Sequence, residues 1–570
     1  MTRAESMCPR LVVAAMDFGT TFSGYAFSFR SNPLDIHTNP NWVAGCAQLI
    51  SNKNQTCVLL KPNKEFAAFG FAAESRYMDL AEDDEHRDYY MFRRFKMKLY
   101  ETKKLDMHST IEDVTGKALP AVDIFAHAIR YLRDHMLNTL QTCVTGIQPD
   151  DILYVLTVPA IWDERAKQFM RKAANKAGIP NDQLRIALEP EAASVWCQVC
   201  TDDKITKLSD AGTKYMVVDL GGGTADITVH EKLVDGRLRE LHRASGGEWG
   251  GNRVEQSYID CLTAMVGHEV MDEFRREHTG DYMTLLMDLE TKKRTVTASL
   301  EGKVTLTVPL TFSECCHKHD INIQDRINKS PFKDKMKWTR DRFRIDKTVA
   351  KSLIDIPLRP LMHHIDGMFK EPSLKDVNAI LLVGGFAESE IVQAEFKKMF
   401  PDKILMIPKD ASLAVLKGAV RFGHMPDVIS NRIARYSFGR EAWPKFDEGE
   451  HDPGRKTKYC GNDVCQQYFW KMVEIGDDLP LGKEVSEEIP GLSAEQTGAH
   501  IKVFCSASTD TKYVDEDTCT QLGELIVPLP DSSDPKDKNI KVSFIFGDTE
   551  LKVWVQIIKT GEELERNVDL

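Results

Sequence analysis

Two segments, far apart in the sequence, repeat the same order of residue types. Each is an apolar run that ends in an aspartate and continues into a turn of glycine and threonine: Asp17-Phe18-Gly19-Thr20-Thr21 and Asp219-Leu220-Gly221-Gly222-Gly223-Thr224-Ala225-Asp226. Glycine has no Cβ, so backbone N–H groups can approach phosphate oxygens, and threonine hydroxyls add further donors. Two such turns facing one another would hold a polyphosphate from both sides.

The aspartates at the two strand ends, Asp17 and Asp219, add a site for a metal ion. Mg²⁺ keeps several of its waters and takes few protein ligands, so carboxylates can hold it through that water shell. A third apolar run, residues 380–383, ends in Gly384 and Gly385 before a predicted helix over 388–399. One turn alone would equally fit an ordinary hairpin, but two turns plus the paired glycines favour nucleotide binding.

Two charged segments could contact other parts of a nucleotide. In the segment Glu290-Thr291-Lys292-Lys293-Arg294-Thr295-Val296-Thr297, helical spacing would place Glu290, Lys293, Arg294 and Thr297 on one face. By spacing alone, this pattern also describes a solvated helix with pairs of opposite charge. Lys96 lies in the basic run 92–98, which by itself is more typical of a basic helix face.

The elements that must position these residues alternate along most of the chain. From residue 11 to about 425, apolar strand-like runs at 11–16, 152–158, 215–218 and 379–383 are separated by helical stretches such as 124–140 and 166–177. This alternation predicts an α/β fold with buried central sheets. After about residue 425 the pattern changes to period two, as in 540–546 and 551–558, which predicts an antiparallel β domain.

Composition narrows the classes of function. The chain has 570 residues, a formal net charge of −12 and 42% hydrophobic residues, which fits several globular domains and argues against a dedicated nucleic-acid binder. No apolar run reaches the length of a membrane span, and no segment is typical of a signal peptide. The 13 cysteines are scattered and odd in number, as expected for reduced thiols. We therefore expect a cytoplasmic protein with no nucleic-acid partner and no membrane span.

At the glycine turns the sequence resembles the ATPase superfamily of actin, sugar kinases and heat-shock chaperones, and within it the heat shock protein 70 family. Val158-Pro159-Ala160-Ile161-Trp162 and Glu189-Pro190-Glu191-Ala192-Ala193 resemble two further segments of that family. Variant details at 95–99, Trp162 and 416–420 resemble a divergent branch, heat shock 70 kDa protein 12. The resemblance covers residues 11–425 well and the C-terminal part weakly.

The resemblance implies an actin-like fold of two duplicated α/β lobes, followed by a smaller antiparallel β domain. It implies a nucleotide-binding domain over 1–425, a linker over 426–450, and a C-terminal β domain over 451–570 that resembles a truncated substrate-binding domain without a helical lid. The implied cofactors are ATP or ADP with Mg²⁺. The implied partners are client proteins, unfolded or specific, and co-chaperones, in a stress response.

The family's roles carry over onto matching positions. Asp17 and Asp219 would position Mg²⁺ through water, and Lys96, Glu189 and Asp226 would be the catalytic group around the γ-phosphate and the attacking water. The implied contacts to the nucleotide itself come from the turns and from the charged segment: Gly19, Thr20, Thr21, Gly221, Gly222, Gly223, Thr224, Glu290, Lys293, Arg294, Thr297, Gly384 and Gly385.

Three departures from the family pattern bear on function. Glu388 stands where the family has a second arginine that stacks on the base, and Lys167 stands where it has an arginine that docks the substrate domain. The family's apolar linker is absent from 423–439. The main expectation is a chaperone-like, ATP-binding protein with slow Mg²⁺-dependent hydrolysis. The alternatives are a nucleotide-gated interaction or signalling scaffold with little hydrolysis and, less favoured, a small-molecule kinase of the same superfamily.

Overall fold

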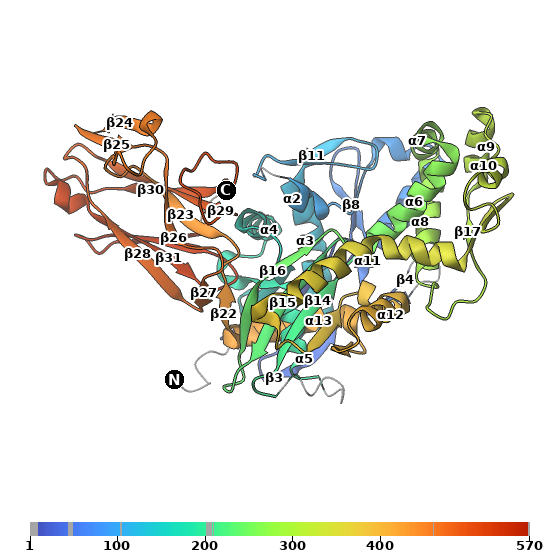
Figure 1. The fold of residues 1–570 in the computed structure, drawn as a ribbon, viewed down its shortest axis with the longest axis horizontal. Coiled ribbons are helices and arrows are strands. Elements are labelled where there is room, and N and C mark those ends of the chain that lie inside the picture. The colour runs from blue at the N-terminus through green and yellow to red at the C-terminus, as the bar shows by residue number, and fades with distance from the viewer. Residues whose placement is uncertain are drawn as a thin grey trace.

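The computed structural model describes residues 9–43, 50–102, 105–200, 208, 210–459 and 461–567. It shows a two-lobed α/β part and, at one end of the long axis, a β domain (Figure 1). The outermost helices of the second lobe, α9 and α10, lie at the opposite end (Figure 1).

The sheet of the first lobe is built on β1 (Val12–Phe18). Its order is β13-β12-β1-β2-β3, in which β1 is parallel to β12 and antiparallel to β2. β1 and β12 are buried along their whole length because both faces of the sheet are covered, which explains their mostly apolar sequences. The other strands of this sheet are β2 (Phe22–Phe29), β3 (Asn32–Thr38), β6 (Asn54–Gln55), β12 (Ile152–Val158) and β13 (Leu184–Leu188).

The second lobe repeats this plan on β14 (Lys214–Leu220). Its order is β21-β20-β14-β15-β16, extended by β22 and β27, and β14 is parallel to β20 and antiparallel to β15. In both lobes the glycine turn therefore joins the same two strands of the plan. The other strands are β15 (Ala225–Lys232), β16 (Leu238–Gly247), β20 (Ala379–Val383), β21 (Ile404–Met406), β22 (Ile429–Ile433) and β27 (Asp478–Pro480).

Two helices, α5 (Glu189–Cys197) and α13 (Ala414–His424), contribute to the core shared by the two sheets. They cross in close contact, since a Cβ on Gly418 would collide with the carbonyl of Ala192. The opposite face of the first sheet packs on α3 (Ala121–Cys143) and α4 (Glu164–Lys176), and that of the second on α6 (Asn252–Val266), α11 (Lys347–Phe369) and α12 (Glu390–Met399).

Smaller elements extend each lobe outward from its sheet. Those of the first lobe are β4 (Trp42–Val43), β5 (Ile50–Ser51), β7 (Cys57–Leu60), β8 (Phe66–Phe69), α1 (Phe71–Glu82), β9 (Tyr90–Arg93), α2 (Met97–Glu101), β10 (Thr110–Glu112) and β11 (Ala118–Pro120). Those of the second lobe are α7 (His268–Glu277), α8 (Thr279–Lys293), β17 (Lys303–Thr307), α9 (Leu310–Lys318), α10 (Ile323–Lys329), β18 (Met336–Thr339) and β19 (Arg342–Asp346).

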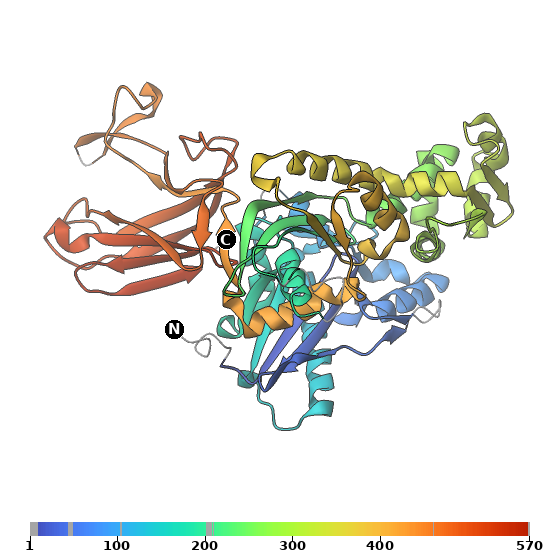
Figure 2. The ribbon, with the colours of Figure 1, turned by 60° about the horizontal axis from the view of Figure 1, so that its bottom comes forward.

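The β domain packs two antiparallel sheets on a shared apolar core. In the sequence 540–546, the alternate residues Val542, Phe544 and Phe546 face this core, as the period of two predicts. A hairpin projects away from the sheets (Figure 2). The strands are β23 (Ser437–Ala442), β26 (Tyr468–Val473), β29 (Gly498–Ser506) and β30 (Cys519–Pro528) in one sheet, β28 (Lys483–Ile489), β31 (Ile540–Phe546), β32 (Lys552–Ile557) and β33 (Glu563–Asn567) in the other, and β24 (Lys456–Tyr459) and β25 (Asn462–Cys465) in the hairpin.

One loop of the β domain, residues 547–551 between β31 and β32, packs against the α/β part through charged side chains. Arg171 of α4 makes a two-pronged ion pair with Glu550, at 2.9 and 2.5 Å. Lys167 bonds both Glu164, at 2.6 Å, and the carbonyl of Thr549, at 2.8 Å. We call the contacts of this loop with α4, β13 and β22 the docking interface.

A second buried pair lies under the same loop. Both guanidinium arms of Arg432 in β22 donate to Glu191 of α5, at 2.8 and 2.7 Å, and Arg432 also bonds the carbonyl of Gly547. The stretch 426–450, expected from the sequence to be a linker, thus contains β22 and β23, and β22 extends the sheet of the second lobe. The fold class, an α/β ATPase fold with a following antiparallel β domain, is as predicted. Among the helices described, none is both long and apolar enough to cross a membrane.

Candidate functional site

The two glycine turns lie against one another between the lobes. The hydroxyl of Thr21, in the first turn, donates to the side-chain oxygen of Asn252 at 2.8 Å. The backbone N–H of Asn252 in turn donates to the carbonyl of Gly222, in the second turn, at 2.7 Å. A Cβ on Gly222 would collide with Thr21, and one on Gly223 would collide with Thr20. Glycine is therefore required here by close packing between the lobes.

Four buried carboxylates gather behind the turns, and we call them, with two lysines, the carboxylate cluster. The acids are Asp17, Glu189, Asp219 and Asp226, which are 5%, 8%, 5% and 1% exposed. Asp219 and Asp226 are direct partners across β14 and β15. The lysines are Lys53, whose Nζ lies 2.5 Å from Asp17 Oδ2, and Lys96, whose Nζ lies 2.7 Å from Glu189 Oε1.

The pKa values of these acids follow from their neighbours. Burial raises the pKa of Asp219 well above its ordinary value, and repulsion from Glu189, Asp226 and Asp17 raises it further. Burial also raises the pKa of Glu189, to about 7, although Lys96 opposes the shift. For Asp17, burial is outweighed by the ion pair with Lys53 and by bonding to Thr157, so its pKa is lowered.

Asp226 lies deepest in the carboxylate cluster. Burial raises its pKa, against the hydrogen bond that it accepts from the N–H of Ile161 at 3.0 Å, the hydroxyl of Thr224 and the weaker influences of Lys96 and Arg435. The two lysines are engaged by Asp17 and Glu189, so the cluster holds two more acids than lysines. An excess of two buried acids favours a divalent cation.

This donor set fits Mg²⁺. Its ligands would all be carboxylate oxygens, which this cation prefers. Within the described ranges, no group of three or more His, Cys, Asp or Glu side chains is placed to hold a metal ion directly. Mg²⁺ would therefore be held through its waters by Asp17 and Asp219, as the sequence suggested, and bound there it would offset the charge of the phosphates.

Several residues of the site carry no motif in the sequence. Lys53 and Thr56 precede β7, and Thr56 bonds the first turn twice, through its hydroxyl to Gly19 O at 2.7 Å and through its N–H to Thr21 O at 2.8 Å. Thr157 in β12 donates to Asp17 at 3.0 Å. No local pattern could have identified them, because the fold alone brings their segments to the turn.

Across the space between the lobes from the first turn, α8 contains only part of the predicted charged segment. The helix ends at Lys293, and the β-branched residues Thr295, Val296 and Thr297 follow it. The prediction that Thr297 shares a helical face with Glu290 is therefore wrong, and its hydroxyl instead contacts Ser299 at 3.3 Å.

The charged residues of α8 form a chain of ion pairs. Glu290 pairs with Lys293 and with Arg294, each at 2.6 Å, and Lys293 also pairs with Glu255 of α6 at 2.5 Å. Glu255 in turn pairs with Arg94 of the first lobe. The guanidinium of Arg294 lies 5.4 Å from the ring of Phe22, also in the first lobe. This chain of ion pairs therefore links the two lobes.

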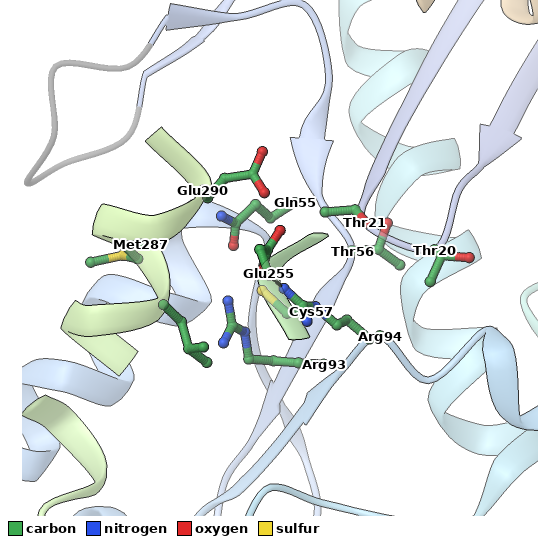
Figure 3. Close-up of a pocket in the computed structure, with 11 residues that line it drawn as sticks. Thr20, Thr21, Gln55, Thr56, Cys57, Arg93, Arg94, Glu255, Met287 and Glu290 are labelled. Atoms are coloured by element: carbon green, nitrogen blue, oxygen red, sulfur yellow. Dashed lines mark hydrogen bonds and ion pairs between the residues drawn. The ribbon is translucent and has the colours of Figure 1, made fainter. Parts of the chain in front are cut away.

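A pocket lies between the first turn and α8 (Figure 3). Thr20, Thr21 and Thr56 approach it from one side and Glu290 and Met287 from the other, as the close-up shows. Implied nucleotide contacts from the first turn, Thr20 and Thr21, and from the charged segment, Glu290, thus surround one space. The rest of its lining is Gln55, Cys57, Arg93, Arg94, Glu255 and Leu286.

The paired glycines end β20 next to the second turn. Gly384 has a φ of +88°, and a Cβ there would collide with the carboxylate of Asp219, so this position requires glycine. Gly385 precedes a short 3₁₀ turn that contains Glu388. The carboxylate of Glu388 is exposed and accepts a hydrogen bond from the N–H of Ser412 at 3.2 Å.

Comparison with known proteins gives a consistent result. Residues 82–425 match the family model described as Hsp70 protein. The chain is 31% identical to human (Homo sapiens) heat shock 70 kDa protein 12B, over 100% of this chain and 92% of the relative. It is 30% identical to mouse (Mus musculus) heat shock 70 kDa protein 12A, over 98% and 91%. It is 27% identical to the chaperone protein DnaK of Ureaplasma urealyticum, over 56% and 48%.

Proposed function

Because the chain belongs to the Hsp70 family, we propose that it binds ATP and ADP with Mg²⁺ between its two glycine turns and hydrolyses ATP slowly. One observation carries the proposal: the turns meet over a buried cluster with two more carboxylates than lysines. Such a cluster is costly to ionise unless a cation joins it. A phosphate chain with its metal ion supplies that cation.

The roles divide along the cleft. Asp17 and Asp219 would hold the cation, and Thr20, Thr21 and residues 221–224 would position the phosphates, since phosphoryl transfer depends mainly on positioning and charge neutralisation. Glu189, with a pKa of about 7, can accept a proton from a water at neutral pH. Lys96, 2.7 Å away, stabilises the ionised form of Glu189 and the charge of the terminal phosphate. Glu290, which lines the pocket, and its ion-pair partners Lys293 and Arg294 would bind the nucleoside.

We extend the proposal to the domains. Residues 1–425 would form the nucleotide-binding domain, and residues 451–570 would be the counterpart of a substrate-binding β domain that contacts client proteins. A cytoplasmic, chaperone-like role in stress, with co-chaperones, stays a prediction.

A second function, a nucleotide-gated scaffold, is favoured by the docking interface. Arg171 and Glu550 are ion-paired across it, and Lys167 reaches Thr549 O at 2.8 Å. Buried, hydrogen-bonded ion pairs resist separation, because parting them leaves charges unpaired. A β domain held in this way would respond to nucleotide by small movements rather than by release. A small-molecule kinase is less favoured and is separated from both by the experiment below.

Calorimetric titration of the full chain with ATP and with ADP, in Mg²⁺ and in EDTA, tests binding. Phosphate release by the same protein, with and without candidate sugars, then separates the functions. A slow ATPase releases phosphate without sugar, a scaffold binds without turnover, and a kinase consumes ATP only with its sugar. Lys96→Ala should spare binding and lower turnover by about 10²–10³-fold. Absence of binding at millimolar nucleotide in Mg²⁺ would overturn the proposal.

A further inference from the structure

Lys53 is a member of the carboxylate cluster to which the roles above assign no part. It comes from the segment before β7, and its ammonium reaches Asp17 Oδ2 at 2.5 Å with only 15% of the side chain exposed. Its partner Asp17 stands at the end of β1, immediately before the first glycine turn. An ammonium paired with Asp17 at this position places a positive charge at the phosphate end of the proposed site.

The segment around Lys53 is held rigidly. The side-chain amide of Asn39 donates to the carbonyl of Asn52 at 2.8 Å, and Asn54 accepts from the N–H of Phe71 at 2.9 Å. The stem of Lys53 lies close to Gly24, where a Cβ would approach Lys53 Cγ to 3.1 Å. A mobile surface lysine loses conformational entropy when it binds a ligand. The side chain of Lys53 is already ordered in the folded protein, so this loss does not weaken binding.

The same segment also forms part of the pocket wall. Gln55 and Thr56, two and three residues after Lys53, line the pocket together with Thr20 and Thr21 (Figure 3). Thr56 is bonded to the first turn at Gly19 and Thr21. Lys53 thus belongs to the segment whose next residues line the pocket, and its ammonium reaches the carboxylate of Asp17 beside the first turn.

We propose that Lys53 is a resident cation of the nucleotide site, which performs part of the charge neutralisation otherwise left to Mg²⁺, so that nucleotide binding persists in weakened form without the metal. The inference rests on the proposed function. Lysine suits this role because its ammonium is a compact point charge that binds phosphate without demanding a fixed geometry. Because Asp17 is already paired, the divalent cation would depend mainly on Asp219, whose carboxylate has no share in either lysine pair.

The proposal predicts a specific split between two affinities. In the full chain, ADP affinity is measured by calorimetry in Mg²⁺ and in EDTA for the wild type, Lys53→Met, Lys53→Arg and Lys61→Met. Lys61 is the matched control. It directly follows β7, its side chain is 43% exposed, and it pairs with Glu65. Lys53→Met should weaken binding about tenfold or more in EDTA and clearly less in Mg²⁺. Lys53→Arg should keep most of the EDTA affinity, and Lys61→Met should change neither.

Each other outcome has a defined meaning. If Lys53→Met lowers the melting temperature but leaves both affinities unchanged, Lys53 is only a structural partner of Asp17 and the proposal is wrong. If it strengthens binding in Mg²⁺, Lys53 competes with the metal, which also overturns the proposal. If Lys53→Met fails to fold, the wild type decides: binding in Mg²⁺ with none in EDTA rejects the resident cation but leaves the proposed function intact. Absence of binding in both buffers rejects the proposed function, and the inference with it.

Discussion

The carboxylate cluster and the docking interface both bury several charged side chains, but they balance the charges differently. At the interface the acids have bases as partners: Glu191 has Arg432, Glu550 has Arg171, and Glu164 has Lys167. In the cluster, four acids share two lysines, and the pKa of Asp219 is raised well above its ordinary value by burial and by its acidic neighbours. Matched buried charges fasten two parts of a protein together, whereas an unmatched set is poised to take up a cation.

The largest effect is expected at the matched pair of the docking interface. Glu191→Leu leaves the guanidinium of Arg432 buried and unpaired, which should lower the free energy of unfolding by about 3–5 kcal/mol in urea denaturation. The double variant Glu191→Leu, Arg432→Met removes both charges and should recover most of that loss. A single variant as stable as the wild type would mean that this pair does not fasten the interface.

Removing an unpaired acid from the carboxylate cluster should not lower the free energy of unfolding, in contrast to the loss of Glu191. Asp219→Asn removes a carboxylate that burial and repulsion disfavour, so the nucleotide-free chain should be at least as stable as the wild type in thermal unfolding. Its affinity for nucleotide in Mg²⁺ should fall about 10–100-fold, or about 1.4–2.8 kcal/mol.

Asp17→Asn is the matched variant for this test, because Asp17 is paired with Lys53. It should also weaken binding in Mg²⁺, but it should lower the stability of the nucleotide-free chain. Equal changes in stability for the two variants would remove the distinction between paired and unpaired acids.

Glu240 of β16 lies beside the docking interface and supplies a pH test. It lies near Glu191 and accepts a hydrogen bond from the N–H of Ile433 at 2.7 Å, and burial is the main cause that raises its pKa to about 8. The unfolded chain ionises Glu240 above its ordinary pKa of 4.5, while the folded chain does so only near 8. The stability from its protonated form is therefore full below 4.5, declines between 4.5 and 8, and is lost above 8.

Glu240→Gln should remove that decline, which is at most about 1.4 kcal/mol per pH unit. Urea denaturation of the wild type and the variant at pH 5, 6, 7 and 8 measures the difference in slope, with these values chosen to span the interval between the two pKa values. Glu269→Gln, an exposed control in α7, should leave the slope as it is. Parallel slopes for wild type and Glu240→Gln would show that Glu240 is ionised throughout.

The smallest effect is expected at Glu388, outside both regions. Glu388→Arg should tighten ATP binding by about 0.5–2 kcal/mol, a few-fold to about thirtyfold, if the base lies between α8 and the turn after Gly385. Glu388 is exposed, and its hydrogen bond from Ser412 N lies at the surface, so the fold should tolerate the change. Tripolyphosphate is the control ligand: equal tightening of both ligands would indicate a simple charge effect, and unchanged ATP affinity would place the base elsewhere.

The sequence predicted those parts of the molecule that local patterns encode. The strands at 152–158 and 540–546 follow from periodicity, and the repeated turns follow from the recurrence of Asp-x-Gly, whereas the two-lobed fold was implied by the resemblance to a known family. The charge spacing over 290–297 predicts a helix that is too long. The β-branched residues that follow Lys293 end the helix there. Glu388, recognised as a departure, proved to bond the backbone at Ser412.

The remainder of the site depends on contacts between distant segments. Lys53 reaches Asp17 only because the first lobe folds its distant segments together, and Asn252 reaches Thr21 only because the two lobes meet. Lys167 stands at the position where the family pattern has an arginine that docks the substrate domain. In the structure Lys167 bonds Thr549 O, and Arg171, four residues further along α4, makes the two-pronged contact to Glu550. The sequence alone does not reveal that Arg171 makes this contact, because Glu550 reaches α4 only in the folded protein.

The central claim, that the unmatched acids form a cation site for a nucleotide, is tested most directly by counting bound cations. Mn²⁺, which takes oxygen ligands as Mg²⁺ does, can be titrated into the full chain with saturating ADP and followed by electron paramagnetic resonance. The account predicts one tightly bound Mn²⁺ per chain in the wild type and its loss in Asp219→Asn. Equal binding of Mn²⁺ by the two proteins, or no more binding than ADP alone shows, would contradict it.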